Sequence, residues 1–264
     1  MRTRKVGIEK LFQLYDHPAA VLFRSIELNA IYEMTKDIDF KEPSLDVGCG
    51  DGVISELLFD SKFTYGVDNG EAHDVEEAVK NDRYGKVLLE SAEKMSLPNE
   101  SLNFIFSNSV IEHIPNNKAV LSEVSRTLKP GGYFLFTSPS RVFGKYLFFT
   151  ELFNRAGLHF LANIYENKRN KMLNHYHIVD DKVYANRLEK NGLEIINYSY
   201  CVSETVMKLW DILTVQSFIA RPFYKNTNYF LTKKYKEKII KLVEKDITTK
   251  GLEANMIVLA CKQT

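Results

Sequence analysis

The sequence predicts an α/β fold: a doubly wound, seven-stranded sheet with helices on both faces and helical cap insertions. Three observations support it. Short apolar runs alternate with helical patterns, a glycine-rich turn joins the first such run to a helix, and 264 residues suffice for one large domain. Alternation at this spacing implies right-handed crossovers and a parallel sheet. The expected strands are 44–47, 64–68, 87–90, 103–107, 133–137, 194–200 and 255–261.

This pattern divides the chain into an N-terminal helical segment, a ligand-binding core, a remainder of the sheet with cap or substrate insertions, and a last core strand. Their bounds are 1–40, 41–140, 141–254 and 255–264. Within the core we expect helices at 52–59, 71–80 and 118–128, the last one followed by a Lys-Pro-Gly-Gly turn. The long connection after residue 200 must carry helices of its own.

Charge is distributed unevenly, although the net charge is only +1. Segment 41–113 holds 6 Lys/Arg and 15 Asp/Glu, whereas 139–177 holds 6 and 2, and 221–250 holds 9 and 3. An acidic core is therefore joined to two basic segments. This balance gives no reason to expect DNA as a partner, and it suggests an anionic small molecule as a ligand of the basic segments.

Cysteine usage and the N-terminus indicate the compartment. The three cysteines, at 49, 201 and 261, show neither a disulfide framework nor zinc-ligand spacing. The N-terminus lacks the apolar region of a signal peptide, and no apolar run approaches the roughly 18 residues of a spanning helix. We expect a cytoplasmic protein. Segment 141–157 mixes basic and apolar residues, which is consistent with weak membrane-surface contact and equally with buried packing.

The glycine turn that follows the first strand predicts a ligand site. Ligands of open parallel sheets bind beyond the carboxyl ends of the strands. A dinucleotide-binding turn reads G-x-G-x-x-G, whereas here the glycines stand at 48, 50 and 52 and follow Asp46. A carboxylate at the lip of the turn disfavours a diphosphate and favours an ammonium or sulfonium group. With Asp68 placed for ribose hydroxyls, the turn predicts a positively charged nucleoside.

Four motifs in register resemble class I S-adenosylmethionine-dependent methyltransferases, closest to the branch acting on small molecules (type 11-like): LDVGCGDG, YGVDNG, ESAEKMSLPNESLNFIFSNSVIEHI and LKPGGYFLFTSPS. The resemblance covers about 40–140, and 175–196 more loosely. It implies a Rossmann-like sheet, S-adenosylmethionine as cofactor and S-adenosylhomocysteine as product. The cofactor-binding residues it implies are Asp46, Gly48, Cys49 and Gly50 at the methionine portion, Asp68 and Asn69 at the ribose, Ser91, Ala92 and Glu93 at the adenine, and Asn108 and Ser109 near the sulfonium.

Candidate catalytic residues are His113, which opens the helix after the fourth strand, and His177, which lies in a loop expected over the pocket. Either imidazole would remove a proton from a hydroxyl acceptor. Helix capping by Glu112 and His113, and loop pinning by His177, are structural alternatives. In some RNA-terminal methyltransferases a similar Glu-His pair binds a metal, but Ser109 stands where that site has an acid, so no metal site is predicted.

The resemblance predicts transfer of a methyl group to a small-molecule acceptor, at a hydroxyl of a glycan-type, lipid-linked or secondary-metabolite substrate. The alternatives are a non-catalytic methyltransferase-like binding subunit, an RNA methyltransferase and a nucleotide-dependent oxidoreductase. The spacing of the glycines after Asp46 counts against the oxidoreductase, and the absence of an added RNA-binding module against RNA. The sequence gives no indication of the oligomeric state.

Overall fold

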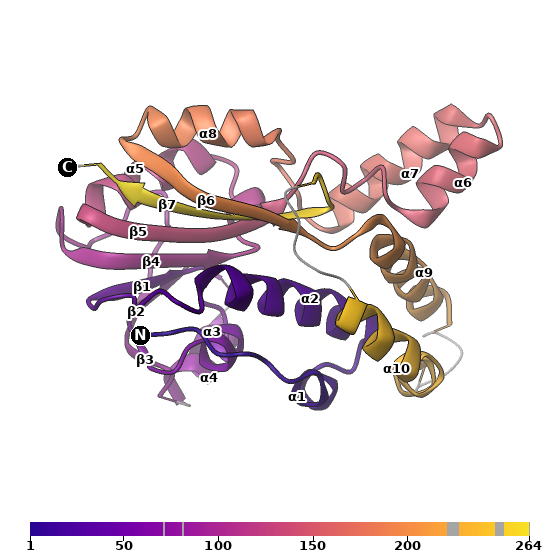
Figure 1. Ribbon diagram of the computed structural model, residues 1–264, viewed down its shortest axis with the longest axis horizontal. Helices are drawn as coiled ribbons and strands as arrows, with labels where there is room; N and C mark the ends of the chain where they lie inside the picture. The colour runs from indigo at the N-terminus through magenta and orange to yellow at the C-terminus, as the bar shows by residue number, and fades with distance from the viewer. Residues whose placement is uncertain (71, 81, 221–226, 246–250, 264) are drawn as a thin grey trace.

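The computed structural model describes residues 1–70, 72–80, 82–220, 227–245 and 251–263. They form a seven-stranded sheet with the order β3-β2-β1-β4-β5-β7-β6, flanked by helices (Figure 1). The strands are β1 (Ser44–Val47), β2 (Phe63–Asp68), β3 (Tyr84–Leu89), β4 (Leu102–Asn108), β5 (Leu128–Pro139), β6 (Leu193–Cys201) and β7 (Asn255–Lys262). Each of the seven predicted strands overlaps an observed one.

The sheet is mixed rather than parallel throughout. Strands β1 to β5 pair in parallel, but β7 lies between β5 and β6 and runs antiparallel to both. The prediction of a wholly parallel sheet was wrong at this edge. Strand–helix alternation along the chain does not reveal which gap the last strand enters, and a long helical connection lets β7 enter in the reverse direction.

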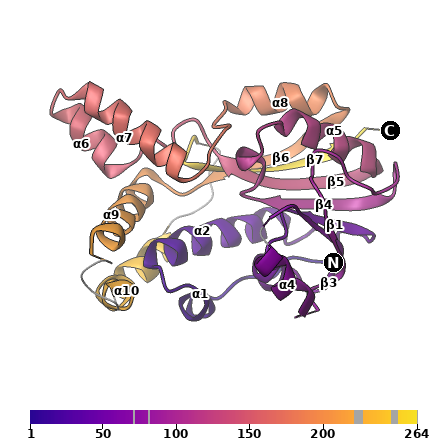
Figure 2. The same ribbon diagram turned by 180° about the vertical axis from the view of Figure 1, so that it is seen from behind.

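Helices cover both faces of this sheet. Helices α1 (Ile8–Leu14), α2 (Pro18–Thr35), α3 (Val53–Leu58) and α4 (Ala72–Lys80) lie below the sheet in Figure 1. Helices α5 (Asn117–Thr127) and α8 (Asp181–Glu189) lie above it, and Figure 2 gives the same arrangement from behind. The helix expected at 71–80 is present from Ala72, while Glu71 lies outside the described residues.

Alternation along the buried strands builds two apolar layers. Phe104 and Phe106 of β4 pack in the layer with α2, and Ile105 between them packs in the layer with α5 and α8. Period-2 alternation places neighbouring side chains on opposite faces, so one short apolar run serves both layers. The turn expected at 129–132 is instead the start of β5, which begins directly where α5 ends.

The remaining helices form a cap at the end of the molecule where the parallel strands have their carboxyl ends (Figure 1). They are α6 (Phe148–Arg155), α7 (His159–Met172), α9 (Glu204–Ala220) and α10 (Thr227–Lys245). Helices α9 and α10 pack on α2, and α6 packs on both α7 and α9. Of the basic segment 221–250, residues 221–226 and 246–250 lie outside the described residues.

Candidate functional site

The glycine turn after β1 brings the backbone close to the loop after β4. Gly48 has φ 73°, and its N–H donates to the Val67 carbonyl at 2.8 Å, which ties the turn to β2. A Cβ on Gly48 would overlap the side chain of Val110. Only glycine therefore fits this position without strain or displacement.

Asp46 lies beneath the turn rather than at its open lip. It is 3% exposed, and its Oδ2 accepts hydrogen bonds from the Ser55 hydroxyl and from the Tyr84 hydroxyl, the latter at 2.6 Å. Burial raises the pKa of this carboxyl to about 6. The expectation that it stands at the lip is corrected: β1 is a central, fully buried strand, so its side chains point into the layers of the sheet, and this one fastens the turn to α3 and β3.

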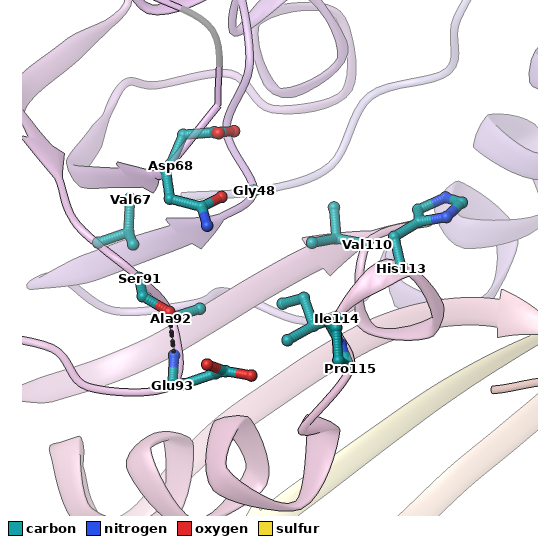
Figure 3. A pocket seen from close by; sticks show the side chains of 11 residues that line it. Gly48, Val67, Asp68, Ser91, Ala92, Glu93, Val110, His113, Ile114 and Pro115 are labelled. Carbon is teal, nitrogen blue, oxygen red and sulfur yellow. Dashed lines mark hydrogen bonds between the residues drawn. The ribbon is translucent and has the colours of Figure 1, made fainter. Parts of the chain in front are cut away.

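A first pocket of about 240 Å³ opens at the carboxyl ends of β1 and β2. Figure 3 shows Asp68, the Ser91–Glu93 stretch and the Val110–Pro115 stretch around it. The Asp68 carboxylate accepts hydrogen bonds from the backbone N–H groups of Gly50 (2.8 Å) and Gly70 (2.6 Å), which fix its position. The pocket is lined by Gly48, Val67, Asp68, Asn69, Ser91, Ala92, Glu93, Val110, His113, Ile114 and Pro115.

A second pocket of about 320 Å³ adjoins the first, and the two share Gly48 and Val110. It is lined by Tyr15, Arg24, Asp46, Gly48, Cys49, Gly50, Asp51, Ile54, Ser55, Phe106, Asn108, Ser109 and Val110. Every one of the eleven cofactor-binding residues implied by the sequence motifs lines one of these two pockets. The structure therefore brings the predicted set together around one elongated site.

Arg24 of helix α2 is a residue of this site that sequence reasoning missed. Its Nη1 donates to Asn108 Oδ1 at 2.8 Å and to Ser109 Oγ at 3.1 Å, and it pairs with Glu27 at 2.5 Å. Glu27 is fully buried and also accepts a hydrogen bond from Asn255 of β7 at 2.9 Å. The Arg–Glu pair three residues apart was the only local signal, and such pairs are common on helix surfaces.

His113 lies in a cluster with Glu112 and His175. The ligand-capable atoms of the three side chains lie within 4.8 Å of one another. His113 Nδ1 is 3.2 Å from the Asn174 carbonyl. A carbonyl only accepts, so Nδ1 carries the proton and Nε2 of the neutral ring carries a lone pair. One carboxylate and two imidazoles are also a donor set that a divalent cation accepts.

Burial sets the protonation states in this cluster. Burial raises the pKa of Glu112 to about 8, and it lowers the pKa of His175 to about 4 and that of His113 below its usual value. Both imidazoles are therefore neutral near pH 7. Glu112 Oε2 and His175 Nδ1 have no hydrogen-bond partner within the described part of the chain.

His177, the second predicted base, lies outside this cluster. Its Nε2 is 2.7 Å from the Pro115 carbonyl and therefore donates to it. The contact ties the loop 173–180 to the short helix η1 (Ile111–His113), together with hydrogen bonds from the backbone N–H groups of Tyr176 and His177 to the Glu112 carbonyl. Its catalytic role stays a prediction, and His175 is the loop histidine that the structure places beside His113.

Comparison with known proteins agrees with this site. Residues 45–136 match the family model described as a methyltransferase domain. The ubiquinone biosynthesis O-methyltransferase of Vibrio atlanticus is 28% identical over 131 residues, which cover 47% of this chain and 54% of that protein. That of Pseudomonas fluorescens (strain Pf0-1) is 34% identical over 113 residues, which cover 39% and 47%. Residues 45–136 are therefore similar to a methyltransferase domain, and the relatives that match this segment in these comparisons are S-adenosylmethionine-dependent methyltransferases by name or fold.

The similarity of fold extends beyond the matched segment. A Thermotoga maritima structure described as an S-adenosylmethionine-dependent methyltransferase, possible histamine N-methyltransferase, superposes with a TM-score of 0.60 and 18% identity, covering 97% of this chain and 94% of that one. At this identity the similarity concerns the fold alone. In sequence, the chain spans about half the length of the curated relatives it matches.

Proposed function

We propose that this protein transfers a methyl group from S-adenosylmethionine to an oxygen atom of a small-molecule acceptor. The observation that carries the proposal is the pair of joined pockets around Gly48, because together they fit a nucleoside followed by an amino-acid chain. Gly48 and Val110 line both pockets, so one extended ligand that contacts these two residues would occupy both pockets. The similarity to O-methyltransferases supports oxygen as the methylated atom.

The residues divide between the two parts of the cofactor. In the first pocket Asp68 would accept hydrogen bonds from the ribose hydroxyls, and Val67 and Ile114 offer apolar walls for the adenine. Ser91 and Glu93 would provide polar contacts at the base edge. In the second pocket Arg24 would bind the carboxylate of the methionine portion, since a guanidinium matches a carboxylate in geometry and charge.

Chemistry at the acceptor requires positioning and a proton acceptor. When bound, S-adenosylmethionine supplies a methyl group that is already electrophilic on its sulfonium. Holding an acceptor oxygen in line with that group provides much of the acceleration. His113 lines the first pocket, and its Nε2 lone pair would take the hydroxyl proton as the oxygen–carbon bond forms and the sulfur–carbon bond breaks. His177 would hold the loop that carries His175.

The acceptor class follows from the cap, which is basic where the core is acidic. We infer an anionic or lipid-linked acceptor. Glycan-type and secondary-metabolite acceptors are the other candidate classes. Segment 139–177 contributes 6 Lys/Arg against 2 Asp/Glu and covers the end of the sheet where the pockets open. The buried ring of Phe143 contacts both His175 and Trp210 of α9, with centroid distances of 5.2 and 5.8 Å, so aromatic packing connects the histidine cluster to the cap.

A glycine pair tests the cofactor site. In Gly48→Ala a side chain would collide with Val110 at a φ of 73°, and we expect S-adenosylhomocysteine to bind about 100-fold more weakly in calorimetry. Gly7→Ala is the matched control, because a Cβ there meets open space at a φ of −73°. Equal affinity in wild type and Gly48→Ala would place the cofactor elsewhere.

Turnover is tested with methyl-labelled S-adenosylmethionine and a cell extract, whose products are partitioned into organic, small-aqueous and polymer fractions. Label that moves with wild type but not with Gly48→Ala supports the proposal, and its fraction identifies the acceptor class. Label in RNA would favour the RNA-methylating alternative. Tight binding of S-adenosylhomocysteine without any transfer would favour a non-catalytic binding subunit.

A further inference from the structure

Helices α6 and α7 form a hairpin that projects from the body of the protein, as both views show (Figures 1 and 2). Its outer surface is apolar. Phe160 at the start of α7 is 75% exposed, and five further large apolar side chains of the hairpin are 40–50% exposed. These are Leu152, Leu158, Leu161, Ile164 and Met172.

The packing inside the hairpin does not need these side chains. The two helices meet through Phe153 and Tyr165, whose ring centroids are 6.3 Å apart, while Thr150 and Ala162 are buried. The Tyr165 hydroxyl donates to Asp211 of α9 at 2.7 Å, which fixes the hairpin to the cap. The sequence allowed buried packing as the reason for the apolar residues here, but the structure leaves this set outside the packed core.

A second apolar surface lies at the same end of the molecule, where α9 ends and α10 begins (Figure 1). Phe218 and Ile219 lie in the last turn of α9, and 70% and 61% of their surface is exposed. Tyr229 and Phe230 in the first turn of α10 are exposed to a similar degree. Large apolar side chains exposed in this number at one end of a molecule mark an interaction site rather than ordinary surface composition. We call these two groups together the outer cap surface.

Two of the helices that carry the outer cap surface, α7 and α10, also carry exposed cations. Lys168 and Lys171 on α7 are exposed, as are Lys233 and Lys234 on α10. The acidic Glu151 is already paired with Arg155 and Lys208. The acidic segment 41–113 comprises β1 to β4 with α3 and α4, which lie in the body of the molecule away from the α6–α7 hairpin (Figure 1). An anionic surface would therefore attract the cap and repel the acidic segment, which orients the protein.

We propose that the outer cap surface docks on an anionic lipid bilayer. Aromatic and aliphatic side chains beside Lys and Arg are the composition of interfacial helices, which insert into the headgroup region while their cations contact anionic lipids. A second copy fits less well, because like-charged lysines of two caps would face each other. Of the helices in the described ranges, none has the length and apolar character needed to cross a bilayer, so the contact is peripheral.

Vesicle sedimentation tests the docking without any methyl-transfer assay. We expect the full chain to sediment with vesicles of phosphatidylcholine and phosphatidylglycerol, and less with phosphatidylcholine alone or in high salt. Phe160→Ser with Leu161→Ser should weaken binding at least about tenfold. Val79→Ser is the matched control, because Val79 is 60% exposed but lies on α4, away from the cap. Lys168→Glu with Lys171→Glu should reduce the increase in binding that phosphatidylglycerol causes, while Lys233 and Lys234 remain.

Three results would overturn the proposal: no binding to either vesicle, equal binding by wild type and the Phe160/Leu161 variant, or a dimer in ultracentrifugation that this variant abolishes. The last result would assign the surface to a second copy. S-adenosylhomocysteine binding is measured on the same samples, which verifies that each variant is folded. It also separates a failure of docking from a failure of the proposed methyl transfer.

Discussion

The core that carries the cofactor pockets and the cap that covers them are stabilised in different ways. In the core, the functional side chains follow the ends of neighbouring strands, so a short motif such as Asp46–Gly50 already contains part of the site. In the cap, the decisive contacts join residues far apart in the chain, as between Arg169 and Asp211. The comparison shows why the cofactor could be inferred from motifs while the acceptor could not.

Asp46 and Glu112 in the core differ from Asp211 in the cap in how their buried carboxyl groups are held. Asp46 and Glu112 in the core lie without a paired cation, and burial raises the pKa of each. Asp211 in the cap is fully buried beside Arg169, 3.3 Å away, and it accepts from the Tyr165 hydroxyl and the Phe149 N–H. Asp46 accepts hydrogen bonds from two neutral hydroxyl groups, whereas Asp211 balances a positive charge.

Removing that charge balance should produce the largest effect. Asp211→Ala leaves the Arg169 guanidinium buried and unpaired, and we expect a loss of about 3–5 kcal/mol in unfolding free energy. Urea denaturation measures it. Asp37→Ala, in the exposed turn that follows α2, is the control and should change stability by less than about 0.5 kcal/mol. A loss below about 1 kcal/mol in Asp211→Ala would show that the cap does not depend on this pair.

Substitutions of the two candidate histidines should have the next largest effect. His113→Asn should lower kcat about 100-fold while S-adenosylhomocysteine affinity stays within about threefold, because the base acts on the acceptor proton. His177→Asn removes a contact to the Pro115 carbonyl and should lower kcat by less than about threefold. The opposite ranking in a methyl-transfer assay would make His177 the base and the loop contact secondary.

Glu112 gives the core a pH dependence that a neutral isostere removes. Because burial raises its pKa to about 8, the folded state holds this proton more tightly than the unfolded state. Its contribution to stability is complete below about pH 4.5 and is lost as the pH rises through about 8. Glu112→Gln does not lose this contribution. Between about pH 5 and pH 8, the unfolding free energy of Glu112→Gln should therefore rise relative to that of wild type by on the order of 2 kcal/mol.

Denaturation curves of both proteins across this pH range test the prediction. Asp46 also titrates there, but it does so in both proteins and cancels in the difference. A difference that is independent of pH would mean that Glu112 is not held in its protonated form.

Substitution of Arg24 should have the smallest effect, and this effect should be limited to the binding of one part of the ligand. Arg24→Lys keeps the charge but loses the guanidinium fork, so S-adenosylhomocysteine should bind about tenfold more weakly. 5′-Methylthioadenosine lacks the amino-acid carboxylate and should bind both proteins equally in calorimetry. Equal weakening of the two ligands would assign Arg24 a role in shaping the pocket instead of binding the carboxylate.

The sequence by itself determined the position of the seven strands, the glycine turn and eleven of the residues that line the two joined pockets. These features are local, because a strand end and the turn after it are adjacent in the chain, and parallel strands bring such ends to one edge. Gly48 illustrates this: its place directly after β1 was enough to predict a close backbone approach, and the structure adds only that Val110 is the neighbour.

Only the tertiary structure decided the rest. The reversed direction of β7, the approach of Arg24 to Asn108, and the choice of His175 as the neighbour of His113 depend on contacts between distant segments. Exposure is equally non-local: Phe160 reads like any core aromatic until the fold leaves it without neighbours. Short sequence patterns determine the helices, strands and turns. The packing of one element on another determines which side chains from distant segments come into contact.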